Sequence, residues 1–306
     1  MREQAAVSLA AESWRSYLSH TRPKSWAPAF LFAATGYLLE PSLKTTAQIA
    51  ADLGALFVVY SIFLWGGTSA YNSSQDHDDG QPLNYLENPP PIPRGLANFG
   101  NILMWAAIPA AAVFWGPKAA ILAAIAHLFS ILYSKRWPGL AFRGKETGLL
   151  DNLINASGCG WIAIYLGWIA SSGGDISGAH PIALAFTLSV FATYPATQIH
   201  QMKATDTYAD AKNYTSLLGP ANALRAAALL LTAAWIVLLS QVYRNLLQDS
   251  FAALFVAFSF VYLSGAMQCW YWAREPFVES KTKFVRLVQL MLISRILFIV
   301  AVNIAR

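Results

Sequence analysis

Side chains that can bind a metal ion gather where one long apolar run ends. The stretch "YNSSQDHDDG" (71–80) follows "ALFVVYSIFLWGG" and contains Asn72, Asp76, Asp78 and Asp79. Asn72 and Asp76 are four residues apart, so a helix carries both side chains on one face. The chain has only 16 acidic residues, and their concentration here is consistent with a cation site or, for a single cluster, with a solvated loop at a helix end.

A second acidic pair closes another apolar run later in the chain. Asp206 and Asp210, in "TDTYAD", are again four residues apart. Two sets of carboxylates that converge raise each other's pKa and repel, and a divalent cation resolves this conflict. Hard oxygen ligands favour Mg²⁺, which commonly shares its ligand shell with the phosphates of a substrate.

Cationic side chains accompany both acidic clusters. A diphosphate needs a metal and direct N–H donors, so this combination favours a diphosphate ligand. A positive-inside topology signal alone produces cations at the same places, and this alternative stays open. The cations are Arg22 and Lys24 before the first apolar run, Lys135, Arg136, Arg143 and Lys145 in the loop after the fourth, and Lys203 and Lys212 beside the second acidic pair.

The rest of the sequence is too apolar for a water-soluble protein. Hydrophobic residues make up 56% of the chain and charged residues 12%, whereas an ordinary soluble domain carries about 25% charged residues. Backbone groups cannot stay unpaired in lipid, and the apolar runs lack the alternation of barrel strands, so we predict helices. The nine runs, each near the length that crosses a bilayer, are 26–40, 48–71, 96–115, 119–134, 150–170, 180–201, 221–243, 250–272 and 284–305.

These runs predict an all-α polytopic membrane protein with about nine transmembrane helices and a single domain, residues 1–306. Residues 1–25 are polar and mixed in charge, and they predict a segment that lies at the membrane surface. With nine spans, sixteen of the 21 Lys and Arg residues fall on the side that holds the N-terminus. The positive-inside rule therefore places the N-terminus and both acidic clusters in the cytoplasm. The expected surroundings are a lipid bilayer, most simply a bacterial inner membrane, and the charge pattern gives no case for a nucleic-acid partner.

The order of these motifs resembles the UbiA superfamily of intramembrane prenyltransferases. That family has nine helices, aspartate-rich motifs after helices two and six, and a basic Tyr-Ser loop after helix four. Its first motif is Asn-Asp-x-x-Asp-x-x-x-Asp; Asn72 and Asp76 match the first and fifth positions, while Ser73 and Gly80 replace two acids. Its second motif, Asp-x-x-x-Asp, matches at 206 and 210.

Two further stretches extend the resemblance over nearly the whole chain. "YS" (133–134), followed by Arg143 and Lys145, resembles the Tyr-Ser-x-x-x-Arg-x-Lys loop of the family with a longer insert. "PPIPRG" (90–95) keeps the Pro-Ile-Pro core and the glycine of Arg-Pro-Ile/Leu-Pro-Ser-Gly, with Arg94 at the serine position. The departures in both motifs favour a divergent member of the family.

The resemblance implies helices around a central cavity and a role for each matching residue. Asp151 and Asn155, one helical turn apart, begin the fifth run beside the basic loop. The implied Mg²⁺ ligands, which are also the catalytic residues, are Asn72, Asp76, Asp79, Asp206 and Asp210. The implied diphosphate-binding residues are Arg22, Arg94, Tyr133, Ser134, Arg143, Lys145 and Lys212. From their places beside these motifs, and not from the resemblance, we expect Asp78, Asp151, Asn155, Gln198 and Tyr208 to support the site.

The function implied by the resemblance is Mg²⁺-dependent prenyl transfer from an isoprenoid diphosphate to a lipophilic acceptor that is aromatic or lipid-like. An alternative is a terpene cyclase that ionises the same substrate and captures the cation with its own chain. A membrane transporter with a carboxylate cation site is a third hypothesis. Against it, the acidic clusters lie at one face, and the sequence shows no clear inverted repeat. Arg295, inside the last run, is costly unless paired, and we expect a structural partner within the bundle, with a substrate role as the alternative.

Overall fold

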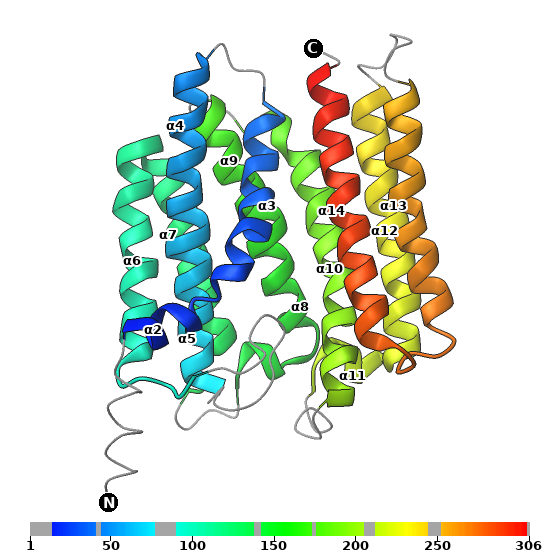
Figure 1. Cartoon of the computed structure of the whole chain (residues 1–306), viewed down its shortest axis with the longest axis horizontal. Helices are drawn as coiled ribbons and strands as arrows, with labels where there is room; N and C mark the ends of the chain where they lie inside the picture. The colour runs from blue at the N-terminus through cyan, green and yellow to red at the C-terminus, as the bar shows by residue number, and fades with distance from the viewer. Residues whose placement is uncertain are drawn as a thin grey trace, which may run out of the picture. The chain divides into compact units, whose positions relative to one another are not determined.

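A computed structural model describes residues 14–40, 44–76, 90–137, 142–172, 176–204, 212–243 and 252–304 of the chain (Figure 1). Within these ranges the regular structure is helical, apart from one isolated bridge between Gly148 and Asn213. The chain divides into two compact units. Unit 1 comprises Met1–Ala34, Ser42–Gly144 and Ile169–Gly174, and unit 2 comprises Thr35–Pro41, Lys145–Trp168 and Asp175–Arg306. The single domain over residues 1–306 stays a prediction.

Unit 1 is built on one long interrupted helix. The short helix α2 (Trp14–His20) lies against α5 (Gly67–Asp76). Helix α4 (Thr46–Leu56) continues through a π-helical stretch (Phe57–Gly66) into α5, which packs on α6 (Leu96–Trp115) and α7 (Pro117–Ser134) (Figure 1). The first residues of α3 (Trp26–Leu38) also belong to this unit. The packing of α5 on α6 and α7 sets the position of the first acidic motif.

Local sequence explains how this long helix begins and where it packs. Thr45 caps α4, because its hydroxyl accepts from the Gln48 amide at 3.3 Å while the Gln48 side chain accepts from the Thr45 amide at 2.8 Å. This reciprocal pair is a capping box, a common start signal for a helix. Gly67 and Gly100 let α5 and α6 approach closely: a Cβ on Gly100 would lie 2.6 Å from the Gly67 carbonyl oxygen. Small residues permit such contacts between membrane helices.

Unit 2 is a bundle around α10. Helix α8 (Gly148–Ala156) continues through a π-helical stretch (Ser157–Ile162) into α9 (Ala163–Ser172), whose last residues belong to unit 1. Helix α10 (His180–Ala204) packs on α8, on α12 (Pro220–Tyr243) and on α14 (Ser280–Ile304), and α13 (Ala252–Trp272) contacts both α12 and α14. The short helix α11 (Tyr214–Leu218) contacts α8, α10 and α12.

The predicted apolar runs correspond to helices of the structure. Seven helical segments in the described ranges are long and apolar enough to cross a membrane. Large apolar side chains on them are exposed, among them Val113, Leu184 and Leu229, as expected where lipid covers the surface. Helix α3 has 13 residues, which at ~1.5 Å per residue is shorter than a ~30 Å hydrocarbon core. The protein is an all-α polytopic membrane protein; the count of nine spans stays a prediction.

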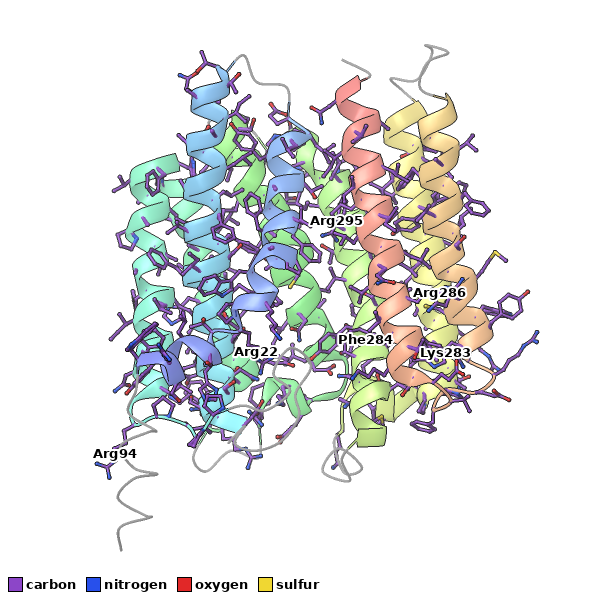
Figure 2. The ribbon with its side chains drawn as sticks, viewed as in Figure 1. Arg22, Arg94, Lys283, Phe284, Arg286 and Arg295 are labelled. Carbon is purple, nitrogen blue, oxygen red and sulfur yellow. The ribbon has the colours of Figure 1, made fainter. Side chains whose placement is uncertain are left out.

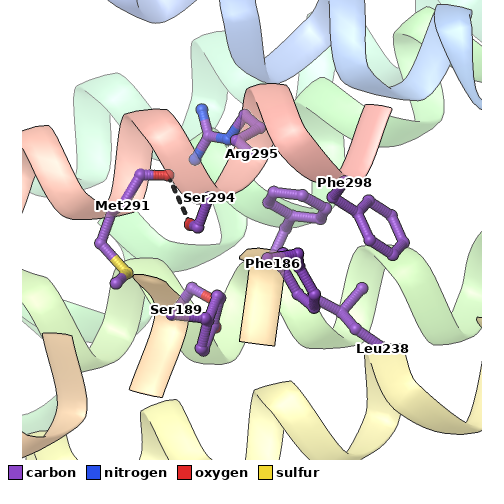
Figure 3. Close-up of a pocket in the computed structure, with 9 residues that line it drawn as sticks. Phe186, Ser189, Leu238, Met291, Ser294, Arg295 and Phe298 are labelled. Atoms are coloured by element: carbon purple, nitrogen blue, oxygen red, sulfur yellow. Dashed lines mark hydrogen bonds between the residues drawn. The ribbon is translucent and has the colours of Figure 1, made fainter. Parts of the chain in front are cut away.

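The buried arginine of the last run has a partner inside unit 2. Arg295 is 9% exposed, and its guanidinium carbon lies 5.0 Å from the ring centre of Phe186 on α10. Figure 3 shows it beside a small pocket that Phe186, Ser189 and Phe298 help to line. A cation over an aromatic face is a stabilising arrangement in an apolar environment. The expectation that Arg295 has a structural partner within the bundle is therefore confirmed.

Candidate active site

Four residues of unit 1, including Arg143 from the segment after α7, form a closed ring of hydrogen bonds near the C-terminal ends of α5 and α7. Asn72 Nδ2 donates to Asp76 Oδ2 at 2.8 Å, and Ser134 Oγ donates to Asn72 Oδ1 at 3.1 Å. Arg143 closes the ring, because its Nε donates to the Ser134 carbonyl oxygen at 2.8 Å and its Nη2 forms an ion pair with Asp76 Oδ1. Each residue of this Asn72–Asp76–Ser134–Arg143 ring thus contacts two others.

The ring holds a nearly buried charge pair. The side chain of Arg143 is 4% exposed and that of Asp76 is 9% exposed. A carboxylate in such surroundings needs a compensating cation, since removal from water strongly disfavours an isolated charge. Arg143 supplies that positive charge, and its planar guanidinium also fixes the direction of the carboxylate.

A second arginine approaches the ring from the turn that follows α2. Arg22 Nη2 donates to Ser73 Oγ at 3.4 Å, and Ser73 is fully buried beside Asn72. Arg22 has a left-handed backbone (φ 55°) at the turn that follows α2. Ser73 stands where the resembled motif has an acid, so here a hydroxyl accepts from a cation in place of a carboxylate.

Helix α2 also holds the "PPIPRG" stretch in place. Ser16 donates to the Pro91 carbonyl oxygen at 2.9 Å, Tyr17 donates to that of Arg94, and His20 Nε2 lies 3.1 Å from that of Pro90. A carbonyl oxygen only accepts, so His20 carries its proton on Nε2. Burial lowers the pKa of His20 below its ordinary value, although hydrogen bonds to this stretch oppose the shift. The imidazole therefore sits as a neutral donor.

Unit 2 contains a buried polar network that joins α8, α10 and α11. Asp151 is fully buried; it accepts from the Asn152 amide at 2.6 Å, from Gln198 Nε2 and from the Tyr214 amide. The Gln198 carbonyl oxygen in turn accepts from the Thr215 hydroxyl. We call Asp151, Gln198 and Thr215 the Asp151 network. All three are less than 6% exposed, and the network fixes how α11 meets α8 and α10.

Two lysines lie on the backbone segments that this network joins. Lys145 belongs to the turn Gly144–Glu146 just before α8 and is half-buried. Lys212 is exposed, and its carbonyl oxygen accepts from the Gly148 amide at 2.5 Å. Asn213 follows it and caps α11 by accepting from the Ser216 amide at 2.8 Å.

The sequence matches no protein-family model and no curated protein. Comparison with solved structures finds a UbiA homolog from Archaeoglobus fulgidus, with TM-score 0.65 and 18% identity over 95% of this chain and 98% of that one. The same homolog bound to GPP and Mg²⁺ has TM-score 0.61 and 17% identity, covering 95% and 99%. A UbiA homolog from Aeropyrum pernix K1 has TM-score 0.64 and 17% identity, covering 94% and 98%.

This chain has the UbiA fold. The resemblance seen in the order of the motifs is thereby confirmed at the level of the fold. Identities of 16–18% leave the roles of single residues to be argued from this chain.

The structure brings some of the predicted site residues together in unit 1. Asn72, Asp76, Ser134 and Arg143 form the ring, and Arg22 reaches Ser73 next to it. Tyr133 is half-buried at the end of α7. Arg94 is exposed, and Figure 2 shows its side chain pointing away from the helices. The structure therefore does not bring Arg94 into the ring.

The remaining predicted residues divide in the same way. Gln198 joins Asp151, whereas the Asn155 side chain turns back to the Asp151 carbonyl oxygen of its own helix at 2.8 Å. No group of three His, Cys, Asp or Glu side chains that could hold a metal lies within the described ranges. The acidic residues Asp78, Asp79, Asp206 and Asp210, together with Tyr208, lie outside those ranges.

Two buried polar residues of the network region were not predicted. Thr215 completes the hydrogen bonding of Gln198, and Asn152 donates to the Phe191 carbonyl oxygen of α10 at 2.9 Å. Thr215 lies in "KNYTSLLG", a stretch that follows the second acidic pair. Thr215 lies two residues after Asn213, the cap of α11, but its partner Gln198 lies on α10, so the local sequence gave no signal for this contact.

Proposed function

We propose that this protein belongs to the UbiA superfamily and is a Mg²⁺-dependent intramembrane prenyltransferase. Its substrate is an isoprenoid diphosphate, and its acceptor is a lipophilic molecule, aromatic or lipid-like. Mg²⁺ is held by oxygen ligands of both acidic motifs: Asn72, Asp76, Asp79, Asp206 and Asp210. The diphosphate is bound in addition by Arg143, Lys145 and Lys212, and Arg22 and Ser134 hydrogen-bond to Ser73 and Asn72 of the first acidic motif.

The observation that carries this proposal is the Asn72–Asp76–Ser134–Arg143 ring. Asp76 and Asn72 offer a carboxylate and an amide oxygen, which are the hard ligands that Mg²⁺ prefers. The Asp76 carboxylate is only 9% exposed and is already paired with a cation. A cation at this carboxylate therefore fits the chemistry of the residues present. Structures of a UbiA homolog from Archaeoglobus fulgidus that shares the fold are bound to GPP and Mg²⁺ or to DMAPP and Mg²⁺, which supports the same ligands here.

Each described residue has a defined task in this proposal. Ser134 and Arg143 orient Asn72 and Asp76 through the ring. Arg143 presents the planar N–H donors that suit phosphate oxygens, and lysines add compact positive charge. The apolar helices keep water from the reacting carbon. When Mg²⁺ is bound, it supplies Lewis-acid stabilisation of the negative charge that grows on the leaving group.

The reaction balances without an added oxidant or reductant. The bond between the first prenyl carbon and the diphosphate oxygen breaks, and its electron pair leaves with the diphosphate. The prenyl carbon forms a new bond to the acceptor, which releases a proton. The cationic side chains stabilise the departing charge more strongly than they stabilise the intact substrate, and this difference is what accelerates the step.

We further propose that the acidic motifs face the cytoplasm in a bacterial inner membrane, as the distribution of Lys and Arg predicts. Water-soluble diphosphate then leaves on the cytoplasmic side, while the prenyl product stays in the bilayer.

Product analysis tests the proposal. Purified protein in nanodiscs is incubated with Mg²⁺ and geranyl, farnesyl or geranylgeranyl diphosphate, with and without a membrane-lipid extract, and products are read by mass spectrometry. Diphosphate release that depends on the extract, together with a prenylated adduct, is the expected result. A cyclic terpene formed without acceptor identifies a terpene cyclase instead. Absence of diphosphate release under all conditions contradicts both enzymes.

A further inference from the structure

The Asp151 network joins two parts of unit 2 that carry cations. On one side, the turn Gly144–Glu146 with Lys145 leads into α8, where Asp151 lies. On the other side, Lys212 directly precedes the Asn213 cap of α11. The Gly148 amide donates to the Lys212 carbonyl oxygen at 2.5 Å, and the Tyr214 amide donates to Asp151. The two segments are therefore fastened at two points a few residues from each lysine.

The carboxylate of Asp151 is suited to this fastening for a simple reason. Three N–H donors converge on it: the Asn152 amide, Gln198 Nε2 and the Tyr214 amide. A carboxylate has only acceptor sites and can satisfy them all. An asparagine has one acceptor oxygen, and its NH₂ group would face a donor. A buried carboxylate is therefore required here where a neutral isostere fails.

Such a network costs stability unless it serves the fold or the function. Asp151 and Thr215 are both fully buried. The three N–H groups that donate to the Asp151 carboxylate are all neutral. A buried charge with only neutral donors is expensive compared with a packed apolar side chain. The Asp151 network lies next to the segments that carry Lys145 and Lys212. The benefit that offsets its cost in stability is therefore the placement of these two cations.

We propose that Asp151 is a positioning residue for diphosphate binding. Through Gln198 and Thr215 it holds the segments of Lys145 and Lys212 in one fixed arrangement, so that both ammonium groups meet the same diphosphate. Asp151 itself does not touch the substrate. The inference rests on the proposed function, because it assigns Lys145 and Lys212 to the diphosphate.

The test measures binding of inorganic pyrophosphate with Mg²⁺ by isothermal titration calorimetry, on the full-length protein in detergent. Asp151→Asn is expected to weaken pyrophosphate binding about tenfold, because hydrogen bonds to a charged group are lost. In a prenyl-transfer assay the same variant raises KM more than it lowers kcat. The thermal midpoint of every variant is measured in parallel.

Two further variants separate positioning from general stability. The double variant Asp151→Asn, Gln198→Glu reverses the direction of the hydrogen bond between positions 151 and 198. The new amide at position 151 donates to the new carboxylate at position 198, and this carboxylate still accepts from the Thr215 hydroxyl. This double variant is expected to recover most of the affinity. Tyr262→Phe removes the buried hydrogen bond to Ser189 in the same unit and is expected to leave pyrophosphate binding unchanged.

The outcomes distinguish the two levels of the account. Wild-type protein that binds no pyrophosphate overturns the proposed function and this inference with it. Wild-type protein that binds, with Asp151→Asn binding equally well, overturns the inference alone. Equal weakening in Asp151→Asn and Tyr262→Phe also overturns it, because the effect would then follow any loss of buried polar contacts in unit 2.

Discussion

The guanidinium of Arg143 lies against the carboxylate of Asp76, and both side chains are nearly inaccessible to water. The residues are 67 positions apart, and the Ser134 carbonyl oxygen holds the arginine from the other side. In the proposed mechanism Asp76 binds Mg²⁺ and Arg143 binds diphosphate. The charges of Asp76 and Arg143 thus neutralise one another in the unliganded protein. When the ligands bind, Mg²⁺ becomes the partner of Asp76 and the diphosphate becomes the partner of Arg143.

This pairing predicts opposite effects of one substitution on metal and substrate. Arg143→Gln removes a positive charge next to the metal ligand, so Mn²⁺, used in place of Mg²⁺, should bind about fivefold to tenfold more tightly in the absence of substrate. The KM for the prenyl diphosphate should rise, because a phosphate donor is lost. Mn²⁺ binding is followed by electron paramagnetic resonance.

Lys135→Gln is the matched control for this prediction. This variant also removes one positive charge from the segment after α7. In the wild-type protein, however, the Lys135 ammonium stacks on Trp137, 4.3 Å from the ring centre, and not on Asp76. Mn²⁺ affinity in this variant should stay at the wild-type level. If Arg143→Gln binds Mn²⁺ no better than wild type, Arg143 and the metal do not share Asp76.

Ser134 contributes to the ring through two different groups. Ser134→Ala removes the hydroxyl that donates to Asn72 and leaves the carbonyl oxygen that accepts from Arg143. Loss of one neutral hydrogen bond costs about 1 kcal/mol, which corresponds to a decrease of about fivefold in kcat/KM. Steady-state kinetics check this value. A loss as large as that in Arg143→Gln would mean that the hydroxyl itself binds substrate.

The contact between α5 and α6 predicts a sensitive glycine. Gly100→Ala places a Cβ 2.6 Å from the Gly67 carbonyl oxygen, and overpacking of this kind costs about 1–3 kcal/mol. Because α5 carries Asn72 and Asp76, activity should fall together with the thermal midpoint. Gly54→Ala is the control: its Cβ meets no atom within 4 Å, and alanine favours a helix by up to about 1 kcal/mol. Equal midpoints for the two variants would show that the helices do not approach as described.

His20 makes the docking of α2 sensitive to pH. Its folded-state pKa is lowered by burial, with nearby Arg22 acting in the same direction, so the unfolded chain binds a proton at higher pH than the folded one. The stability due to neutral His20 is complete above about pH 6.5 and decreases as pH falls towards the folded pKa. His20→Gln keeps a donor for the Pro90 carbonyl oxygen without this titration.

The thermal midpoint of wild type is therefore expected to drop more than that of His20→Gln between about pH 7.5 and about pH 5.5. Differential scanning fluorimetry in detergent gives both values. Identical pH profiles would show that His20 is not protonated on unfolding in this range.

The sequence predicted the local part of the site well. Asn72 and Asp76, placed on one helical face by their spacing, lie in contact at 2.8 Å. The apolar runs correspond to helices because hydropathy alone decides which segments enter lipid. The π-helical stretches Phe57–Gly66 and Ser157–Ile162 were not predicted. A π-helical turn shifts the apolar face of a helix, but a helix that is apolar on all sides has no such face in its sequence pattern, so the shift cannot be detected.

The long-range part of the site needed the structure. Ser134 and Arg143 were expected to bind diphosphate, and their hydrogen bonds to Asn72 and Asp76 depend on how α7 packs against α5. Thr215 and Asn152 are single polar residues whose burial depends on neighbouring helices. No spacing rule marks such residues, because their partners lie on other elements.

The most direct test of the account is the Mg²⁺ dependence of diphosphate release by Asp76→Ala. Asp52→Ala is the matched control, because Asp52 is also ion-paired, to Lys44 at 2.7 Å, and lies on α4 away from the ring. Release is measured against Mg²⁺ concentration, with EDTA as the zero point. The account predicts Mg²⁺-dependent release in wild type and Asp52→Ala and none in Asp76→Ala, although the latter stays folded. Full release by Asp76→Ala, or release by wild type in EDTA, would contradict it.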